Sequence, residues 1–259
     1  MADNIFANIL GVTEGIELKE PKLKIAIIGE PKTGKSWLAA TAPGPVFVAD
    51  FDGRKESLRG KKDVFVKTYT DLNPSTPIAI SAFETDIAMF EYMEQQGKPI
   101  PATFVCDSMT YMRAACEHEL IKQHPAMSRK IKLGTNEIKI PSGWDIINGN
   151  RAYMEYIIGR LSLLGHVICV FHEAAEKDVA TSTKEEKKYT GRTTVQPQYL
   201  ASILSLFNEV WRVSLDYQNN YIVQIKPNNE FLASSTLTLD AVEKPNIQMM
   251  LAKHKLAHP

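Results

Sequence analysis

Short apolar runs alternate along the chain with longer segments in which apolar residues recur every three or four positions. Four of the runs are continuous, and they cover residues 25–28, 46–49, 103–106 and 167–171. Continuous runs rich in β-branched and aromatic residues are typical of strands buried on both faces of a sheet. The pattern therefore predicts a sheet that is covered on both sides.

Segments with helical periodicity separate these strands. Apolar residues at helical spacing predict helices over residues 82–96, 109–120, 145–164 and 199–206. Further strands are expected at residues 64–66, as a sheet edge, and at 209–215, 221–226 and 237–239. Alternating strands and helices imply an α/β fold with a mainly parallel sheet and right-handed crossovers. We expect one domain over residues 22–240, with a lead-in segment at 1–21 and a C-terminal tail at 241–259.

The stretch IAIIGEPKTGKSWLAAT joins the first predicted strand to a helix. It contains the pattern Gly-x-x-x-x-Gly-Lys-Ser, formed by Gly29, Gly34, Lys35 and Ser36. In a strand–loop–helix context the loop N–H groups can wrap phosphates, the lysine reaches the β- and γ-phosphates, and the serine hydroxyl ligates Mg²⁺. The stretch therefore predicts a site for ATP and Mg²⁺. The predicted contacts are Gly29, Glu30, Pro31, Lys32, Thr33, Gly34, Lys35, Ser36 and Trp37.

Composition narrows the function classes without identifying one. The chain has 259 residues, of which 44% are hydrophobic and 23% charged, and its formal net charge is zero. These values are ordinary for a soluble globular protein, and they exclude a polycation drawn to nucleic acid by overall charge. The three cysteines, Cys106, Cys116 and Cys169, lack C-x-x-C spacing and are expected to be buried thiols in a reducing compartment. Since the sequence shows no basic leader and no apolar run long enough for a bilayer, we expect a cytoplasmic protein.

Polar residues follow the predicted strands at the edge where ligands bind in parallel sheets. Asp107 ends the strand at 103–106 and is placed to hold Mg²⁺ opposite Ser36; the alternative is a helix cap. Asp50 and Asp52 end the strand at 46–49. One of them can orient the water that attacks the γ-phosphate, and the alternative is a simple turn that ends in glycine.

His172 follows the strand at 167–171 in the same predicted crevice. A lone histidine is more often a satisfied core or surface residue than a functional one. At this strand end it is placed to contact the γ-phosphate and to report its loss to the following loop. Both interpretations remain open from the sequence.

Taken in order, the phosphate loop, Asp50 and Asp52, Asp107 and His172 resemble the RecA-like core ATPases. More narrowly, the chain is similar to phage-encoded nucleotide-binding proteins of the AAA_24 type, which include RecA-core-only single-strand annealing proteins. The similarity rests on the stretches FANILGVTEG, LAATAPGPVFVADFDG, FVCDS and VICVFHEAAEKD. It extends over about residues 5–240 and is most specific at the nucleotide site.

The resemblance implies a RecA-like P-loop NTPase core that acts in phage DNA recombination or replication, with ATP controlling the binding of single-stranded DNA. It implies catalytic roles for Lys35, for Asp52 as the carboxylate after the phosphate-loop helix, and for His172 as a switch before a DNA-binding loop. The implied partners are single-stranded DNA, further copies of the chain in a homo-oligomer, and a single-strand DNA-binding protein, with no membrane. The implied location is the cytoplasm of a bacterial host.

Two features depart from the family pattern. Relatives of this kind often carry a basic element late in the chain that supplies a cation to a neighbour's γ-phosphate. Here the corresponding stretch FLASSTLTLD contains no lysine or arginine, and Lys226 on the preceding predicted strand is the nearby substitute. The catalytic acid is also an aspartate, Asp52, where glutamate is common. Both departures argue against fast, oligomer-activated hydrolysis.

Two segments concentrate positive charge and are the predicted DNA contacts. Residues 122–143 contain the alternating stretch KIKLGTNEIKI, which predicts a hairpin. Residues 177–194 carry several cations together with Tyr189, a combination that suits backbone tracking and base stacking on a single strand. The alternative is that both are solvated loops, since glutamates dilute the second. The predicted DNA-binding residues are Lys130, Lys132, Lys187, Lys188 and Arg192.

The sequence thus favours a RecA-like ATPase that binds single-stranded DNA as an oligomer and promotes annealing or strand exchange. The first alternative is a nucleotide-gated assembly or interaction protein with little or no ATP turnover, because the late cationic element is missing. The second is a small-molecule phosphotransferase, which is disfavoured because no arginine-rich lid segment follows the phosphate loop.

Overall fold

The main sheet is built from the apolar runs that the sequence predicts as strands. In the computed structural model, which describes residues 22–133, 136–141, 144–173, 203–227 and 233–257, its strands are β1 (Lys24–Gly29), β2 (Val46–Asp50), β3 (Val64–Thr68), β4 (Thr103–Asp107), β7 (His166–His172), β8 (Glu209–Leu215), β9 (Tyr221–Gln224) and β10 (Val242–Glu243). Their order across the sheet is β10-β9-β8-β1-β7-β4-β2-β3. Neighbours from β8 to β3 are parallel, and β9 and β10 join antiparallel. The predicted α/β fold with a mainly parallel sheet is confirmed, and β3 is the predicted edge.

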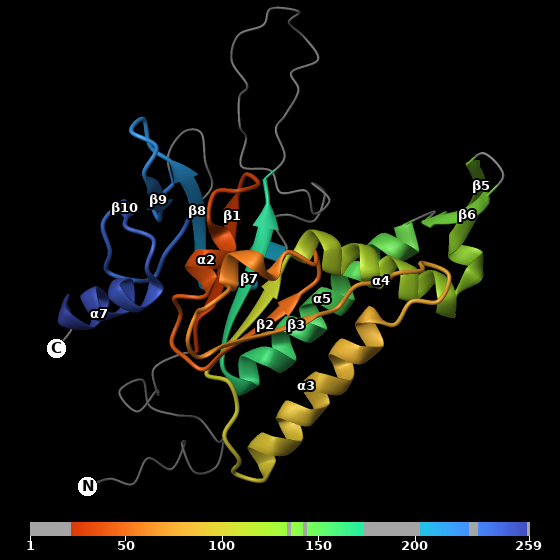
Figure 1. The fold of residues 1–259 in the computed structure, drawn as a ribbon, viewed down its shortest axis with the longest axis horizontal. Coiled ribbons are helices and arrows are strands. Elements are labelled where there is room, and N and C mark those ends of the chain that lie inside the picture. The colour runs from red at the N-terminus through yellow and green to blue at the C-terminus, as the bar shows by residue number, and fades with distance from the viewer. Residues whose placement is uncertain (1–21, 134–135, 142–143, 174–202, 228–232, 258–259) are drawn as a thin grey trace, which may run out of the picture.

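Helices flank this sheet (Figure 1). One group comprises α3 (Ala79–Gln95), α4 (Met109–Gln123) and α5 (Trp144–Leu164), close to the predicted helical ranges. The short helix α2 (Lys35–Ala39) and the C-terminal helix α7 (Ile247–Ala257) contribute to a different part of the core. The strands between them are buried on both faces, which explains their continuous apolar sequences.

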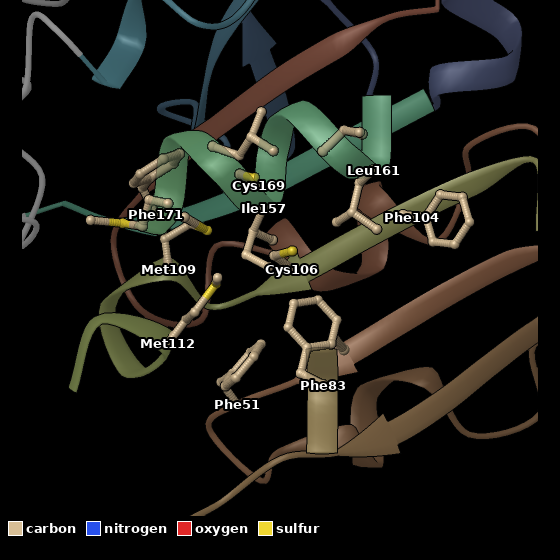
Figure 2. Close-up of a cluster of buried hydrophobic side chains, with 14 of the residues drawn as sticks. Phe51, Phe83, Phe104, Cys106, Met109, Met112, Ile157, Leu161, Cys169 and Phe171 are labelled. Carbon is tan, nitrogen blue, oxygen red and sulfur yellow. The ribbon is translucent and has the colours of Figure 1, made fainter. Parts of the chain in front are cut away.

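The hydrophobic core has two parts because successive strand residues point to opposite faces of the sheet. On β1, Ala26 and Ile28 belong to the part that packs on α3, α4 and α5, whereas Ile25 and Ile27 belong to the part that contacts α2 and α7. Figure 2 shows side chains of the first part, where the rings of Phe51 and Phe83 meet edge to face at 5.3 Å. The three cysteines are buried free thiols, as the sequence predicts.

The C-terminal residues differ from the sequence prediction. The strand expected at 237–239 is absent from those positions, and the short strand β10 forms instead at Val242–Glu243, where it pairs with β9. Ile247 and Met250 of α7 are buried in the core. The segment 241–259, predicted as a tail, therefore supplies a strand and a helix to the folded unit. The lead-in 1–21 lies outside the described residues, as does the first half, 199–202, of the helix predicted at 199–206.

The predicted hairpin in the basic segment is confirmed. Strands β5 (Ser128–Leu133) and β6 (Asn136–Pro141) form a separate two-stranded antiparallel sheet in which Lys130 lies opposite Lys139. In Figure 1 this hairpin lies beyond the end of α4, on the opposite side of the molecule from β9, β10 and α7.

Candidate nucleotide site

The strand order brings the predicted site residues to one edge of the sheet. Gly29 at the end of β1 is in register with His172 at the end of β7, and Asp50 of β2 is in register with Asp107 of β4. Because β7 lies between β1 and β4, His172 is held between the phosphate loop and Asp107. All four strands are parallel, so their carboxyl ends meet where ligands bind in folds of this kind.

A cavity of about 760 Å³ opens at this edge. Its lining includes the predicted phosphate-loop contacts Pro31, Lys32, Thr33, Gly34, Lys35, Ser36 and Trp37. The strand-end residues Asp52, Asp107 and His172 line the same cavity. Its remaining lining residues, Arg54, Glu56, Ser57, Tyr221 and Pro245, were not predicted from the sequence. The volume is in the range of sites that hold small molecules and cofactors.

The two glycines of the phosphate loop are required for different reasons. Gly34 has a φ of 83°, in the left-handed region that side chains disfavour. At Gly29 a Cβ atom would lie 2.5 Å from the carbonyl oxygen of Val213 on β8, so a side chain would push the loop off the sheet. Between them, the Thr33 hydroxyl donates a 2.8 Å hydrogen bond to the carbonyl of Glu30 and closes the turn.

Lys35 is buried inside the loop that it follows. Its ammonium donates hydrogen bonds to the carbonyls of Gly29, at 3.0 Å, and Glu30, at 2.5 Å. Burial lowers the pKa of Lys35 to about 8, although the charges of Asp107 and Glu173 act in the opposite direction. Lys35 therefore carries its charge at neutral pH, at a position surrounded by the loop. A buried cation in such a loop is suited to bind phosphate.

Asp107 and Ser36 form the pair of oxygen ligands that a magnesium site needs. Burial raises the pKa of Asp107 to about 6, while a hydrogen bond from the Ser36 side chain acts to lower it. Asp107 ends β4, and the residue after it, Ser108, is the cap of α4. The Asp107 carboxylate and the Ser36 hydroxyl belong to residues that line the same cavity. A hydroxyl and a carboxylate match the hard oxygen chemistry of Mg²⁺.

Asp50 and Asp52 have distinct environments. The carboxylate of Asp50 accepts hydrogen bonds from the backbone N–H groups of Gly53, at 2.8 Å, and Arg54, at 3.3 Å, and from the Thr68 hydroxyl, at 3.1 Å. Asp50 therefore shapes the turn, whereas Asp52 lines the cavity. Burial, with the charge of Asp50, raises the pKa of Asp52, as suits a carboxylate that accepts a proton. The predicted water-orienting role of Asp52 remains a prediction, and its place in the cavity supports it.

His172 is neutral at neutral pH. Burial lowers its pKa to about 4, and the charges of Lys35 and Arg54 act in the same direction. Its Nε2 atom is buried and has no hydrogen-bond partner among the described residues. An unpartnered polar atom of this kind is uncommon in folded proteins and calls for a functional explanation. His172 also lines the cavity, so the residue lies beside the space that a bound group would occupy.

A buried ion pair next to the loop was not predicted from the sequence. Arg212 on β8 holds the carboxylate of Glu173 through Nε, at 3.1 Å to both oxygens, and through a second nitrogen at 3.0 Å. The N–H of Glu173 donates a 2.9 Å hydrogen bond to the carbonyl of Gly29. The pair thus fixes the end of β7, and with it His172, against the phosphate loop. Residues 39 positions apart form this contact, so no local pattern predicts it.

Of the predicted DNA contacts, the structure describes the backbone of Lys130 and Lys132. Lys130 and Lys132 lie on β5, in the hairpin on the far side of α4 (Figure 1). Lys187, Lys188 and Arg192 lie outside the described residues. Their role in binding DNA therefore stays a prediction.

The fold and the loop define the chain as a P-loop nucleotide-binding protein. A family model described as an AAA domain, AAA_24, matches residues 21–237, and the chain belongs to this family. It therefore contains an AAA-type P-loop ATPase domain. No curated protein matches the chain significantly. Within the described residues, no helix has both the length and the apolar character needed to cross a membrane.

Proposed function

We propose that this protein binds and hydrolyses ATP with Mg²⁺, and that its nucleotide state controls the binding of single-stranded DNA during phage recombination or replication. The observation that carries the proposal is the single cavity shared by the phosphate loop, Asp52, Asp107 and His172. A nucleotide held there would contact residues suited to bind phosphate, to hold a metal ion, to activate water and to sense the γ-phosphate.

The chain's own residues supply the binding chemistry. Lys35 would exchange its carbonyl partners for the β- and γ-phosphate oxygens, which are stronger partners for a buried cation. Ser36 and Asp107 would hold Mg²⁺, which neutralises phosphate charge when it is bound. Both residues line the same cavity, and the Ser36 side chain is close enough to act on the pKa of Asp107.

Hydrolysis would depend on Asp52. The oxygen of a water molecule attacks the γ-phosphorus, the bond to the β–γ bridging oxygen breaks, and ADP leaves with that electron pair. The proton of the attacking water passes to the Asp52 carboxylate, whose pKa is raised by burial and by Asp50. His172, neutral and with Nε2 unpartnered among the described residues, would contact the γ-phosphate until it leaves.

The DNA-binding part of the proposal is supported by charge and by family resemblance. The strands β5 and β6 contain Arg129, Lys130, Lys132 and Lys139 against a single acidic residue, Glu137. Cations repeated along a hairpin suit the backbone of a single strand. The segment 177–194 follows His172 in sequence and contains the other predicted cations. We propose that the protein acts on the strand as a homo-oligomer and meets a single-strand DNA-binding protein there.

A second candidate is a nucleotide-gated assembly protein with little turnover. It is favoured by the absence of lysine and arginine from FLASSTLTLD, the stretch that in relatives supplies a cation to a neighbouring subunit. Such a protein would use the same cavity for binding and would change partners with the nucleotide state.

Two measurements on the purified full chain test these candidates. ATP turnover is followed with and without single-stranded oligothymidine, and DNA affinity is titrated against single and double strands with and without a non-hydrolysable ATP analogue. We expect turnover that rises with DNA, and single-strand affinity that rises about 5- to 150-fold with the analogue. If the protein binds the analogue but shows neither ATP turnover nor a change in DNA affinity, the result would support the assembly protein instead.

His172→Ala is the matched variant for the switch. It should leave ATP affinity nearly unchanged and abolish the analogue-dependent gain in single-strand affinity, because a ligand shifts a loop only through its differential contacts with the two states. If the variant keeps the full gain, His172 is not the sensor.

A further inference from the structure

We infer that Arg54 is a catalytic residue that stabilises the transferring γ-phosphoryl group from within the same chain. The inference rests on the proposed ATPase function and supplies the cation that FLASSTLTLD lacks. Charge develops on the phosphoryl oxygens and on the bridging oxygen as the bond to ADP breaks. An arginine beside those oxygens neutralises it, whether it comes from a neighbouring chain or from the enzyme itself.

The position of Arg54 carries the inference. It lines the cavity together with Lys35, Asp52 and His172. Its Nε lies 4.0 Å from a carboxylate oxygen of Asp52, the residue proposed to orient the attacking water. Its positive charge also acts on His172, which lines the same cavity. Arg54 therefore faces the region in which the terminal phosphate would meet both residues.

The turn before Arg54 fixes its backbone. Asp50 accepts hydrogen bonds from the N–H groups of Gly53 and Arg54, and Asp52 accepts a further one from Arg54 at 3.0 Å. Gly53 has a φ of 74°, which only glycine adopts readily, so the chain reverses at this residue. A fixed backbone with a long side chain that is 63% exposed lets the guanidinium reach the cavity without disturbing the fold.

The neighbouring cations are not among the residues that line the cavity. The Lys61 ammonium lies 3.9 Å from the ring centre of Trp37, Lys55 is the first residue of the short 3-10 turn Lys55–Leu58, and Arg59 follows that turn. Of the basic residues between positions 54 and 62, Arg54 is the one that lines the cavity. The guanidinium fork also matches phosphate oxygens in a way that an ammonium does not. The ion pair with Asp52 is long, at 4.0 Å, and the Arg54 side chain is largely exposed, so a structural role alone predicts a small effect on stability.

The test compares Arg54→Ala and Arg54→Lys with Arg59→Ala, which removes an equal charge from the same segment outside the cavity. For Arg54→Ala we expect kcat to fall about 10²-fold with KM changed only a few-fold, because the contact is made in the transition state. Arg54→Lys should recover part of the loss. Arg59→Ala should match the wild type, and thermal melting should show all variants folded.

Binding of ADP and of ADP with aluminium fluoride, a transition-state analogue, gives a readout independent of turnover. Arg54→Ala should weaken binding of ADP with aluminium fluoride while leaving ADP binding unchanged. Equal kcat in Arg54→Ala and Arg59→Ala overturns the inference, as does wild-type protein that binds ADP with aluminium fluoride no more tightly than ADP. Wild-type protein that binds no adenine nucleotide overturns the proposed function, and the role of Arg54 with it.

Discussion

The nucleotide cavity and the β5–β6 hairpin both carry cations, but they hold them differently. Lys35 is buried, its ammonium is fixed by two carbonyls, and its pKa is lowered by burial. Lys130 and Lys132 lie on a two-stranded sheet that pairs only within itself among the described strands. A preorganised cation recognises one group at one position. A row of cations on a hairpin can instead bind a charged nucleic-acid backbone in many positions.

The comparison predicts that changes in the cavity cause large, specific losses. Lys35→Ala removes the charge that faces the β- and γ-phosphates and should abolish productive ATP binding while the protein stays folded. Isothermal titration with a non-hydrolysable ATP analogue measures the loss. Lys55→Ala, which replaces an exposed lysine that does not line the cavity, is the control. Wild-type affinity in Lys35→Ala would show that the loop is not a phosphate site.

Within the cavity, substitutions of Asp52 and Asp107 should affect different steps. Asp52→Asn should keep analogue binding and slow hydrolysis by about 10²-fold, because it removes the proton acceptor for the attacking water. Asp107→Asn should instead weaken the gain in nucleotide affinity that Mg²⁺ provides. Turnover and Mg²⁺ titrations on both variants measure these effects. Unchanged turnover in Asp52→Asn would move the water-orienting role to Asp50 or remove it.

Changes in the basic segments should cause smaller, graded losses. Two variants test this: one replaces Lys130 and Lys132 with alanine, and the other replaces Lys187, Lys188 and Arg192. Each should weaken single-strand binding both with and without nucleotide. The slope of log affinity against log salt should become shallower by roughly 0.7 for each DNA phosphate that the variant no longer neutralises, since fewer counterions are released. Anisotropy titrations across salt measure the slope, with Lys98→Ala as the exposed control. A segment whose variant keeps the wild-type slope is not part of the DNA site.

The smallest expected effect concerns pH. Burial lowers the pKa of His172 in the folded protein from its usual 6.5 to about 4, so between these values the unfolded chain binds a proton that the folded protein excludes. Stability is therefore complete above pH 6.5 and falls as the pH is lowered toward 4. Because His172 is only half-buried, we expect about 1 kcal/mol of loss at pH 5 relative to pH 7.

Urea unfolding of the wild type and of His172→Gln at both pH values isolates this contribution. The variant should lose less stability between pH 7 and pH 5 than the wild type. Equal losses would mean that His172 takes up its proton in the folded protein and is not held neutral in the cavity.

The local features of this protein could be predicted from short stretches of its sequence. The buried strands followed from continuous apolar runs, and the phosphate loop from a short pattern between a strand and a helix, because both depend on neighbouring residues. The hairpin at 128–141 was also predicted, since its two strands are adjacent in the chain. The prediction of a strand at 237–239 was wrong. A short apolar pattern near the end of a domain does not determine which residues pair with the neighbouring strand.

How these pieces combine depends on the fold, which brings distant segments together. It placed β7 between β1 and β4, which sets His172 beside the phosphate loop, and it brought Tyr221 and Pro245 to a cavity that begins nearly two hundred positions earlier in the chain. It also distinguished Asp50, which holds a turn, from Asp52, which faces the cavity. These arrangements depend on strand pairing and packing between distant segments, and their energies cannot be inferred from a local pattern of residues.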